Sequence, residues 1–192
     1  MHKDLFQTKD DHIEHLLCTY NYFDNFINNQ KNVQLFHLQT NINTLISMMQ
    51  PLLHNNSISI YNQCPDYTIN VCESEITLVL LNILNNSFYE LTKNKTLKKR
   101  YIFIEAQLKE NSSLEIHIKD TRKTLNPNTI FKDYSNTSEV KQNADMRLFS
   151  SYKIVQESLK GELRVEHCDF LFENKKLACT DFIITIKECS HA

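Results

Sequence analysis

One stretch of sequence decides the fold: Leu78-Val79-Leu80-Leu81-Asn82-Ile83-Leu84-Asn85-Asn86-Ser87-Phe88-Tyr89-Glu90-Leu91. Most of its residues are apolar and it contains no Pro or Gly, so we expect a helix that is buried on more than one side. Asn82, Asn85, Asn86 and Tyr89 recur at helical spacing and form one polar stripe along that helix. Polar groups on a buried helix need hydrogen-bond partners. Two interpretations are open: the stripe faces solvent, or it lines a site.

The composition excludes several classes of protein. The formal net charge is −2, with both signs mixed along the chain, which argues against a nucleic-acid partner or an anionic membrane surface. The six cysteines include no C-x-x-C pair, so we expect reduced thiols rather than a metal site or a disulfide framework. The sequence contains neither a signal peptide nor an apolar stretch long enough to span a membrane. We therefore expect a cytoplasmic chain with one medium domain and an appended element.

Predicted helices and strands follow one another in a definite order. We expect helices over 10–29, 36–54, 73–91 and 148–159, and strands over 57–61, 68–71, 101–106, 114–119, 162–167 and 181–187. The strands at 101–106 and 114–119 form a hairpin. The chain has a single glycine, Gly161, against an average usage of roughly 7%. Glycine loops that present backbone amides to a phosphate are therefore disfavoured.

The spacing Asn82-Ile83-Leu84-Asn85-Asn86 resembles the N-box of the ATP-binding domain of sensor histidine kinases, within the wider superfamily of gyrase, chaperone, kinase and mismatch-repair ATPases. The resemblance implies that this helix forms the floor of the ATP site. It implies that Asn86 holds the magnesium ion on the phosphates and that Asn82 lies beside it. Ser87 stands where the family usually has Ala. The order of elements from about residue 10 to residue 187 also agrees with the family.

The fold class implied is an α/β (α+β) two-layer sandwich of the Bergerat type, with a mixed sheet covered on one face by helices. Residues 34–192 correspond to the ATPase domain. Residues 1–33 resemble the second helix of the dimerisation hairpin, with its typical ending at Asp24-Asn25-Phe26-Ile27, and imply a homodimer. We expect no counterpart in this sequence, which begins at Met1, of the first hairpin helix that carries the phosphorylated His.

Two histidines, His12 and His15, lie on the predicted helix over 10–29. Either one is a phosphoacceptor, as in phosphotransferases on a kinase-like scaffold, or both are surface residues of an amphipathic helix. Neither is followed by the acidic and basic residues that usually follow an acceptor His in kinases, and neither has an acidic neighbour placed to orient the imidazole. The sequence favours the surface interpretation.

The segment Asp120-Thr121-Arg122-Lys123-Thr124 occupies the place of the family's Asp-x-Gly-x-Gly box, whose Asp accepts a hydrogen bond from the adenine amino group. Asp120 is kept, but Arg122 and Thr124 replace both glycines. Residues 130–138 resemble the family's Ile-Phe-Glu-Pro-Phe/Tyr-Phe-Thr-Thr-Lys segment, with Ser138 in place of the Lys.

The phosphate lid, expected as Gly-x-Gly-x-Gly-Leu, reads Ala144-Asp145-Met146-Arg147-Leu148-Phe149. Met146 and Leu148 thus bring side chains to the place where the chain should close on the triphosphate. Losing about three amide–phosphate hydrogen bonds, at roughly 1 kcal/mol each, weakens binding ~100-fold. The retained Gly161 falls where the family has a Gly between its last helix and the next strand, and we expect it to end the helix.

These observations predict a degenerate, kinase-like domain (a pseudokinase) that acts as a binding or regulatory module in a two-component-type signalling system. We expect no catalytic residues, a vestigial nucleotide site at Asn82, Asn86 and Asp120, and a response regulator or a kinase as partner. No cofactor is expected; if nucleotide binding is retained, the ligand is Mg-ATP or ADP, with Asn86 on the magnesium. The alternatives are a divergent ATP-binding fragment of a sensor histidine kinase and a phosphotransferase that uses His12 or His15.

Overall fold

The chain folds around one mixed sheet, in a computed structural model that describes residues 32–93, 99–110, 112–122, 131 and 147–187. Its elements are β1 (Val33–His37), α2 (Leu38–Asn55), β2 (Ile58–Asn62), β3 (Thr68–Cys72), α3 (Glu73–Lys93), β4 (Arg100–Leu108), β5 (Leu114–Asp120), η1 (Ile154–Ser158), β6 (Glu162–Phe172) and β7 (Lys175–Ile186). Residues 147–153 are α-helical and continue into η1, which is a π-helix. The predicted helix over 10–29 lies outside the described residues.

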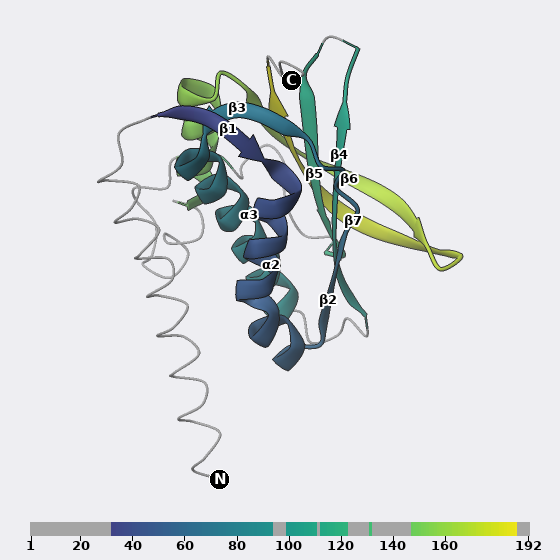
Figure 1. Ribbon diagram of the computed structural model, residues 1–192. Coiled ribbons are helices and arrows are strands. Elements are labelled where there is room, and N and C mark those ends of the chain that lie inside the picture. The colour runs from purple at the N-terminus through teal and green to yellow at the C-terminus, as the bar shows by residue number, and fades with distance from the viewer. Residues whose placement is uncertain (1–31, 94–98, 111, 123–130, 132–146, 188–192) are drawn as a thin grey trace, which may run out of the picture.

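The sheet has the strand order β2-β4-β5-β7-β6. β2 pairs with β4 in parallel, and the other neighbours are antiparallel, so the predicted mixed sheet is confirmed. Figure 1 shows α2 and α3 side by side on one face of this sheet. The prediction missed β1, which pairs antiparallel with β3 and buries only Phe36 of its five residues, so its sequence carries little apolar pattern.

α3 is the centre of the core, because it is buried continuously from Glu75 to Ser87. Its leucines and isoleucines contact both α2 and the sheet, as the run of apolar residues predicts. Asn82, Asn85 and Asn86 are only 1%, 4% and 6% exposed. The interpretation in which the Asn stripe faces solvent is therefore wrong, and these amides need partners inside the protein.

The last two strands are longer than the sequence predicts. A two-residue turn at Glu173 and Asn174 joins β6 to β7, and both residues have positive φ, 49° and 59°. Such turns favour Asn and Gly, so Glu173 makes this turn difficult to recognise from the sequence. β5 ends at its pairing of Asp120 with Thr180, so residues 168–179 continue past β5 as a two-stranded arm (Figure 1).

The arm packs its aromatic side chains on the sheet. Phe170 lies 4.7 Å from Phe103 between ring centroids, and Phe172 lies 4.9 Å from Tyr61 and 5.3 Å from Tyr101. These contacts join the hairpin to β2 and β4, which are not its neighbours in the sheet. Edge-to-face and tilted aromatic pairs of this kind add to the apolar area that they bury.

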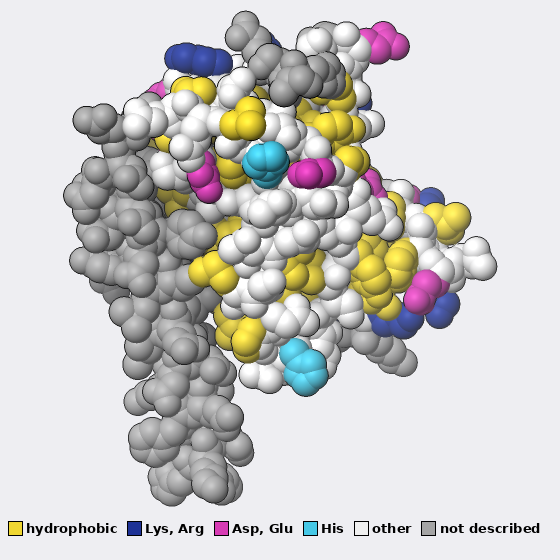
Figure 2. All heavy atoms as spheres, in the orientation of Figure 1, with side chains coloured by type: hydrophobic (Ala, Val, Ile, Leu, Met, Phe, Trp, Pro, Cys, Tyr) yellow, Lys and Arg dark blue, Asp and Glu magenta, His cyan; other side chains and the backbone are white. Residues whose placement is uncertain are grey.

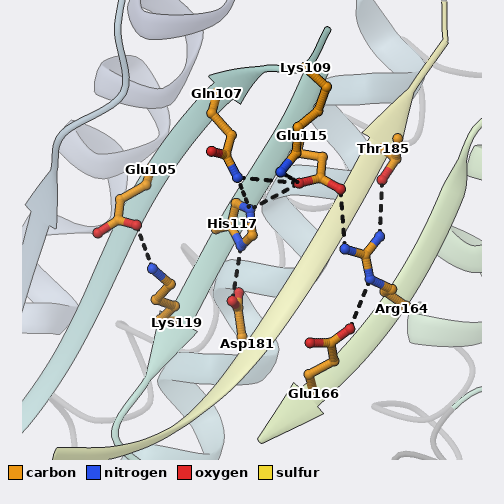
Figure 3. A network of polar contacts seen from close by, with 10 residues as sticks. All are labelled: Glu105, Gln107, Lys109, Glu115, His117, Lys119, Arg164, Glu166, Asp181 and Thr185. Carbon is orange, nitrogen blue, oxygen red and sulfur yellow. Dashed lines mark hydrogen bonds and ion pairs between the residues drawn. The ribbon is translucent and has the colours of Figure 1, made fainter. Parts of the chain in front are cut away.

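The sheet face opposite the helices also carries a polar network (Figure 3). Glu115 on β5 is at its centre, 2.8 Å from Lys109 and 3.1 Å from Arg164. Nδ1 of His117 lies 2.9 Å from Asp181 on β7. Burial alone would raise the pKa of Glu115, but the hydrogen bonds and charges of Lys109 and Arg164 outweigh it and lower that pKa to about 2.

Gly161 takes part in the helix end, as the sequence predicts, because its backbone N–H donates to the backbone oxygen of Val155 at 2.8 Å, and it has a second role as well. The residue with left-handed backbone at this helix end is Lys160, with φ of 52°, whereas Gly161 does not have a positive φ. A Cβ at Gly161 would lie 2.1 Å from the carbonyl oxygen of Thr185. The glycine is therefore needed for the close approach of two backbones.

The surface of the described residues agrees with the mixed composition. On the face shown in Figure 2, basic side chains appear singly or in small groups rather than as one continuous basic area. Among the described residues, no helix is both long enough and apolar enough to cross a membrane.

Candidate functional site

The first part of the site is the attachment of the helix at 147–153 to α3. The side-chain amide of Asn82 donates to Oγ of Ser151 at 3.0 Å and to the backbone oxygen of Arg147 at 3.4 Å. Ser151 in turn donates to the same oxygen of Arg147 at 2.9 Å. Asn82 therefore holds residues 147–151 of this helix against α3, and this contact uses the amide that the resemblance places beside Asn86.

The second part lies at the end of β5. Asp120 is the last residue of that strand, and both its side chain and that of Arg122 are almost completely buried, at 0% and 1% exposed. Nε of Arg122 lies 3.0 Å from Oδ1 of Asp120, and the backbone N–H of Arg122 donates to the same oxygen at 3.2 Å. The chain thus turns back after β5 and pairs Asp120 with the residue two positions further on.

Arg122 also reaches α3. With the Asn86 amide oriented by its hydrogen bonds, Oδ1 of Asn86 accepts from Nη1 of Arg122 at 3.1 Å and from Nη2 at 2.8 Å. The guanidinium carbon lies 5.2 Å from the ring centroid of Phe182, and Thr180 donates to the backbone oxygen of Arg122 at 3.2 Å. A single guanidinium therefore bridges Asp120 on the sheet and Asn86 on the helix.

Burial raises the pKa of Asp120 to about 6. The charge of Arg122 and its backbone N–H both lower that pKa and offset part of the rise. Burial also lowers the pKa of Arg122, while Asp120 and Glu90 oppose this change. An arginine stays protonated at any ordinary pH, so the site holds a permanent buried cation.

The sequence placed three residues in the nucleotide site, and the structure connects two of them. Asn86 and Asp120 are joined through Arg122, whereas Asn82 lies one turn earlier on α3 and bonds to the following helix. Sequence reasoning missed Arg122 as a member of the site. The sequence shows that Arg122 replaces a glycine, but it does not show which groups the new side chain contacts.

Leu148 corrects another expectation. It is 1% exposed and belongs to the hydrophobic core, so its side chain packs inward instead of obstructing the lid. Arg147 precedes it, and burial lowers the pKa of that guanidinium while Tyr89 on α3 opposes the shift. His12, His15, Thr124, Ser138 and Met146 lie outside the described residues.

The donors present do not fit a magnesium ion on Asn86. Magnesium requires oxygen ligands, and Oδ1 of Asn86 faces a guanidinium in this arrangement. Among the described residues there is no group of three or more His, Cys, Asp or Glu side chains that could hold a metal. In the described part of the site, the side chains of Asp120 and Arg122 form an ion pair that contacts the amide of Asn86.

No protein-family model and no curated protein matches the sequence. By structure the chain is similar to the nucleotide-free catalytic domain of the histidine kinase ThkA, with a TM-score of 0.61 and 16% identity, covering 81% of this chain and 97% of that one. The histidine kinase AdeS of Acinetobacter baumannii matches with a TM-score of 0.63 and 15% identity, covering 97% of this chain and 85% of that one. The fold is that of histidine-kinase catalytic domains.

A third structure with a similar fold is that of ThkA in complex with the response regulator protein TrrA. It matches with a TM-score of 0.61 and 14% identity, covering 96% of this chain and 50% of that one. At these identities the likeness establishes the architecture, and what the kinase-like site can do depends on its own residues.

Proposed function

We propose that this chain is a histidine-kinase-like domain that has lost kinase activity and acts as a binding or regulatory module of a two-component-type system. The observation that carries the proposal is the position of Arg122. It stands where the family's box has its first glycine, and its guanidinium engages both Asp120 and Asn86. The two groups that the resemblance assigns to adenine and to magnesium are thus occupied by the chain's own cation.

A nucleotide that enters this site has to separate Arg122 from Asp120 first. Removing one partner of a buried ion pair costs about 3–5 kcal/mol, because the other charge is left uncompensated. New contacts to the ligand offset only part of that cost. The lid glycines, whose amides hold the phosphates in the family, are absent. Both effects act against binding, and we expect a dissociation constant for Mg-ATP weaker than about 1 mM.

The partner that suits this function is a response regulator or another kinase. ThkA was solved together with a response regulator, which supports a receiver-type partner for a domain of the same fold. Residues 1–33 supply the dimerisation-type helix in this proposal, and the assembly is a homodimer.

Titration calorimetry with Mg-ATP tests the proposal on three forms of the full chain: the natural sequence, Arg122→Gly, and Arg122→Gly with Asp120→Asn. We expect no binding up to millimolar nucleotide for the natural chain. Arg122→Gly restores the family's glycine and frees Asp120, so its affinity should be at least about tenfold tighter. The added Asp120→Asn change should remove that gain. A micromolar constant for the natural chain that Asp120→Ala abolishes would instead support the divergent ATP-binding kinase.

Phosphotransfer is tested separately. Incubation with phosphorylated receiver domains should give no acid-labile label on the chain, since neither His12 nor His15 is followed in the sequence by the acidic and basic residues that usually follow an acceptor His. Label that disappears in His12→Ala or His15→Ala would establish the phosphotransferase alternative.

A further inference from the structure

Two free cysteines lie opposite one another where the arm formed by residues 168–179 begins, next to the end of β5. Cys168 on β6 and Cys179 on β7 are direct cross-strand partners, and both thiols are free. Cross-strand Cα atoms in antiparallel pairs lie about 4.5–5.5 Å apart. Disulfides span Cα separations of about 4.4–6.8 Å, so this register already has the spacing of a disulfide bond.

The two sulfurs share one side of the sheet. Cys179 and Asp181 are two residues apart on β7, and Asp181 belongs to the polar network on the face opposite the helices (Figure 3). Burial and the charge of Asp181 raise the pKa of Cys168 above its ordinary value, and the charge of Lys119 offsets only part of the rise. The register places the two thiols opposite one another, and Lys119 supplies a nearby cation.

Access differs between the two thiols. Cys179 is 2% exposed, while Cys168 is partly exposed on the outer strand of the sheet. Burial raises the pKa of Cys179 to about 12, so its thiolate is scarce at neutral pH. An oxidant from solution reaches Cys168 first, and Cys179 is positioned to react with the product.

We propose that Cys168 and Cys179 are a redox modification site that takes up a peroxide oxidant and closes to a cross-strand disulfide. In the first step the Cys168 sulfur attacks one oxygen of hydrogen peroxide, the O–O bond breaks, and Cys168 sulfenic acid and water form. In the second step the Cys179 sulfur attacks the sulfur of Cys168, an S–S bond forms, and the hydroxyl leaves as water with the Cys179 proton. Two electrons pass from the thiols to the peroxide.

The position of the bond gives it a structural effect. The bond joins β6 to β7 at the point where these two strands extend past the end of β5. Phe170 and Phe172, further along β6, pack on β4 and β2. Cys179 is also the neighbour of Thr180, which donates to the backbone of Arg122. Oxidation thus fixes the strand that holds Arg122, and this inference requires no nucleotide in the site.

The test uses the full chain with Cys18→Ser and Cys189→Ser, so that the four described cysteines remain. The reduced protein is treated with hydrogen peroxide, its free thiols are alkylated, and peptides are mapped by mass spectrometry without reduction. We expect loss of two thiols per chain, a linked peptide that joins Cys168 to Cys179, and full reversal by dithiothreitol. Cys64 and Cys72 should remain alkylated in the same digest, which makes them internal controls.

Single substitutions test the order of the steps. In Cys179→Ser, dimedone should trap the sulfenic acid on Cys168, whereas Cys168→Ser should give neither a dimedone adduct on Cys179 nor a linked peptide. Thiol loss at Cys64 or Cys72 with Cys168 and Cys179 still alkylated would overturn the proposal. Linkage only between chains, seen as a dimer on a non-reducing gel, would overturn it as well. The peptide map of the parent chain decides the matter even if a serine variant does not fold.

Discussion

Replacing Arg122 by Met tests whether the site is held together as described. Met has an unbranched side chain of similar length, so the substitution largely preserves the packing. It removes the ion pair with Asp120 and both hydrogen bonds to Asn86. The carboxylate of Asp120 is then left fully buried, with the backbone N–H of residue 122 as its remaining hydrogen-bond donor. A buried charge that loses its counter-ion destabilises the folded state strongly.

We expect Arg122→Met to lower the free energy of unfolding by about 3–5 kcal/mol at pH 7. The loss should shrink at lower pH. The pKa of Asp120 is already raised to about 6 in the natural chain, and without the guanidinium it rises further. The folded state then binds a proton that the unfolded state releases, so its stability increases as the pH falls from 7 toward 5. Protonation removes the uncompensated charge.

Urea unfolding at pH 7 and at pH 5 measures both effects, and the matched control is Arg122→Met combined with Asp120→Asn. The double variant has no charge left in the site, so it should recover most of the stability and lose the pH dependence. Two results would refute the reasoning. One is a loss below about 1 kcal/mol for Arg122→Met at pH 7; the other is a double variant whose loss equals the sum of the two single losses.

Three further predictions concern the rest of the fold. Glu115→Gln should lower the free energy of unfolding at pH 7 by on the order of 1–2 kcal/mol, after discounting for solvent screening. Only the ionised carboxylate gains from Lys109 and Arg164, so in acid unfolding the difference from the natural chain should vanish as the pH falls from 4.5 to about 2. Gly161→Ala should cost about 1–3 kcal/mol in thermal unfolding, since its Cβ meets Thr185, whereas Lys160→Gly, at positive φ, should be neutral or stabilising. Light scattering at tens of micromolar should give a dimer for the full chain and a monomer for a version that begins at Gln34; two monomers would contradict a dimer through residues 10–29.

The sequence was most informative where a long periodic pattern met a buried surface. The apolar run of α3 predicts a helix buried on several sides, and the structure confirms it. The strands with clear alternation, β4 and β5, fall within two residues of their predicted bounds. The sequence did not predict β1, because four of its five residues are exposed. It did not predict the arm, because Glu173 stands where the turn favours Asn or Gly.

The site could be predicted only in part, for a physical reason. Spacing identifies which residues share a helix face, so Asn82 and Asn86 were found together. It does not say which partner across the fold satisfies each amide. Asn82 meets Ser151, and Asn86 meets Arg122, at sequence separations that no periodicity reports.

One departure from the pattern that the resemblance implies acts directly on a buried carboxylate. Arg122 stands where a glycine is expected, and its guanidinium pairs with Asp120. The ion pair offsets only part of the cost of burying this carboxylate, because the pKa of Asp120 is still raised to about 6 and its Oδ2 has no hydrogen-bond partner among the described residues. The pair with Arg122 nevertheless gives Asp120 a structural role, so its presence does not by itself indicate that a nucleotide binds.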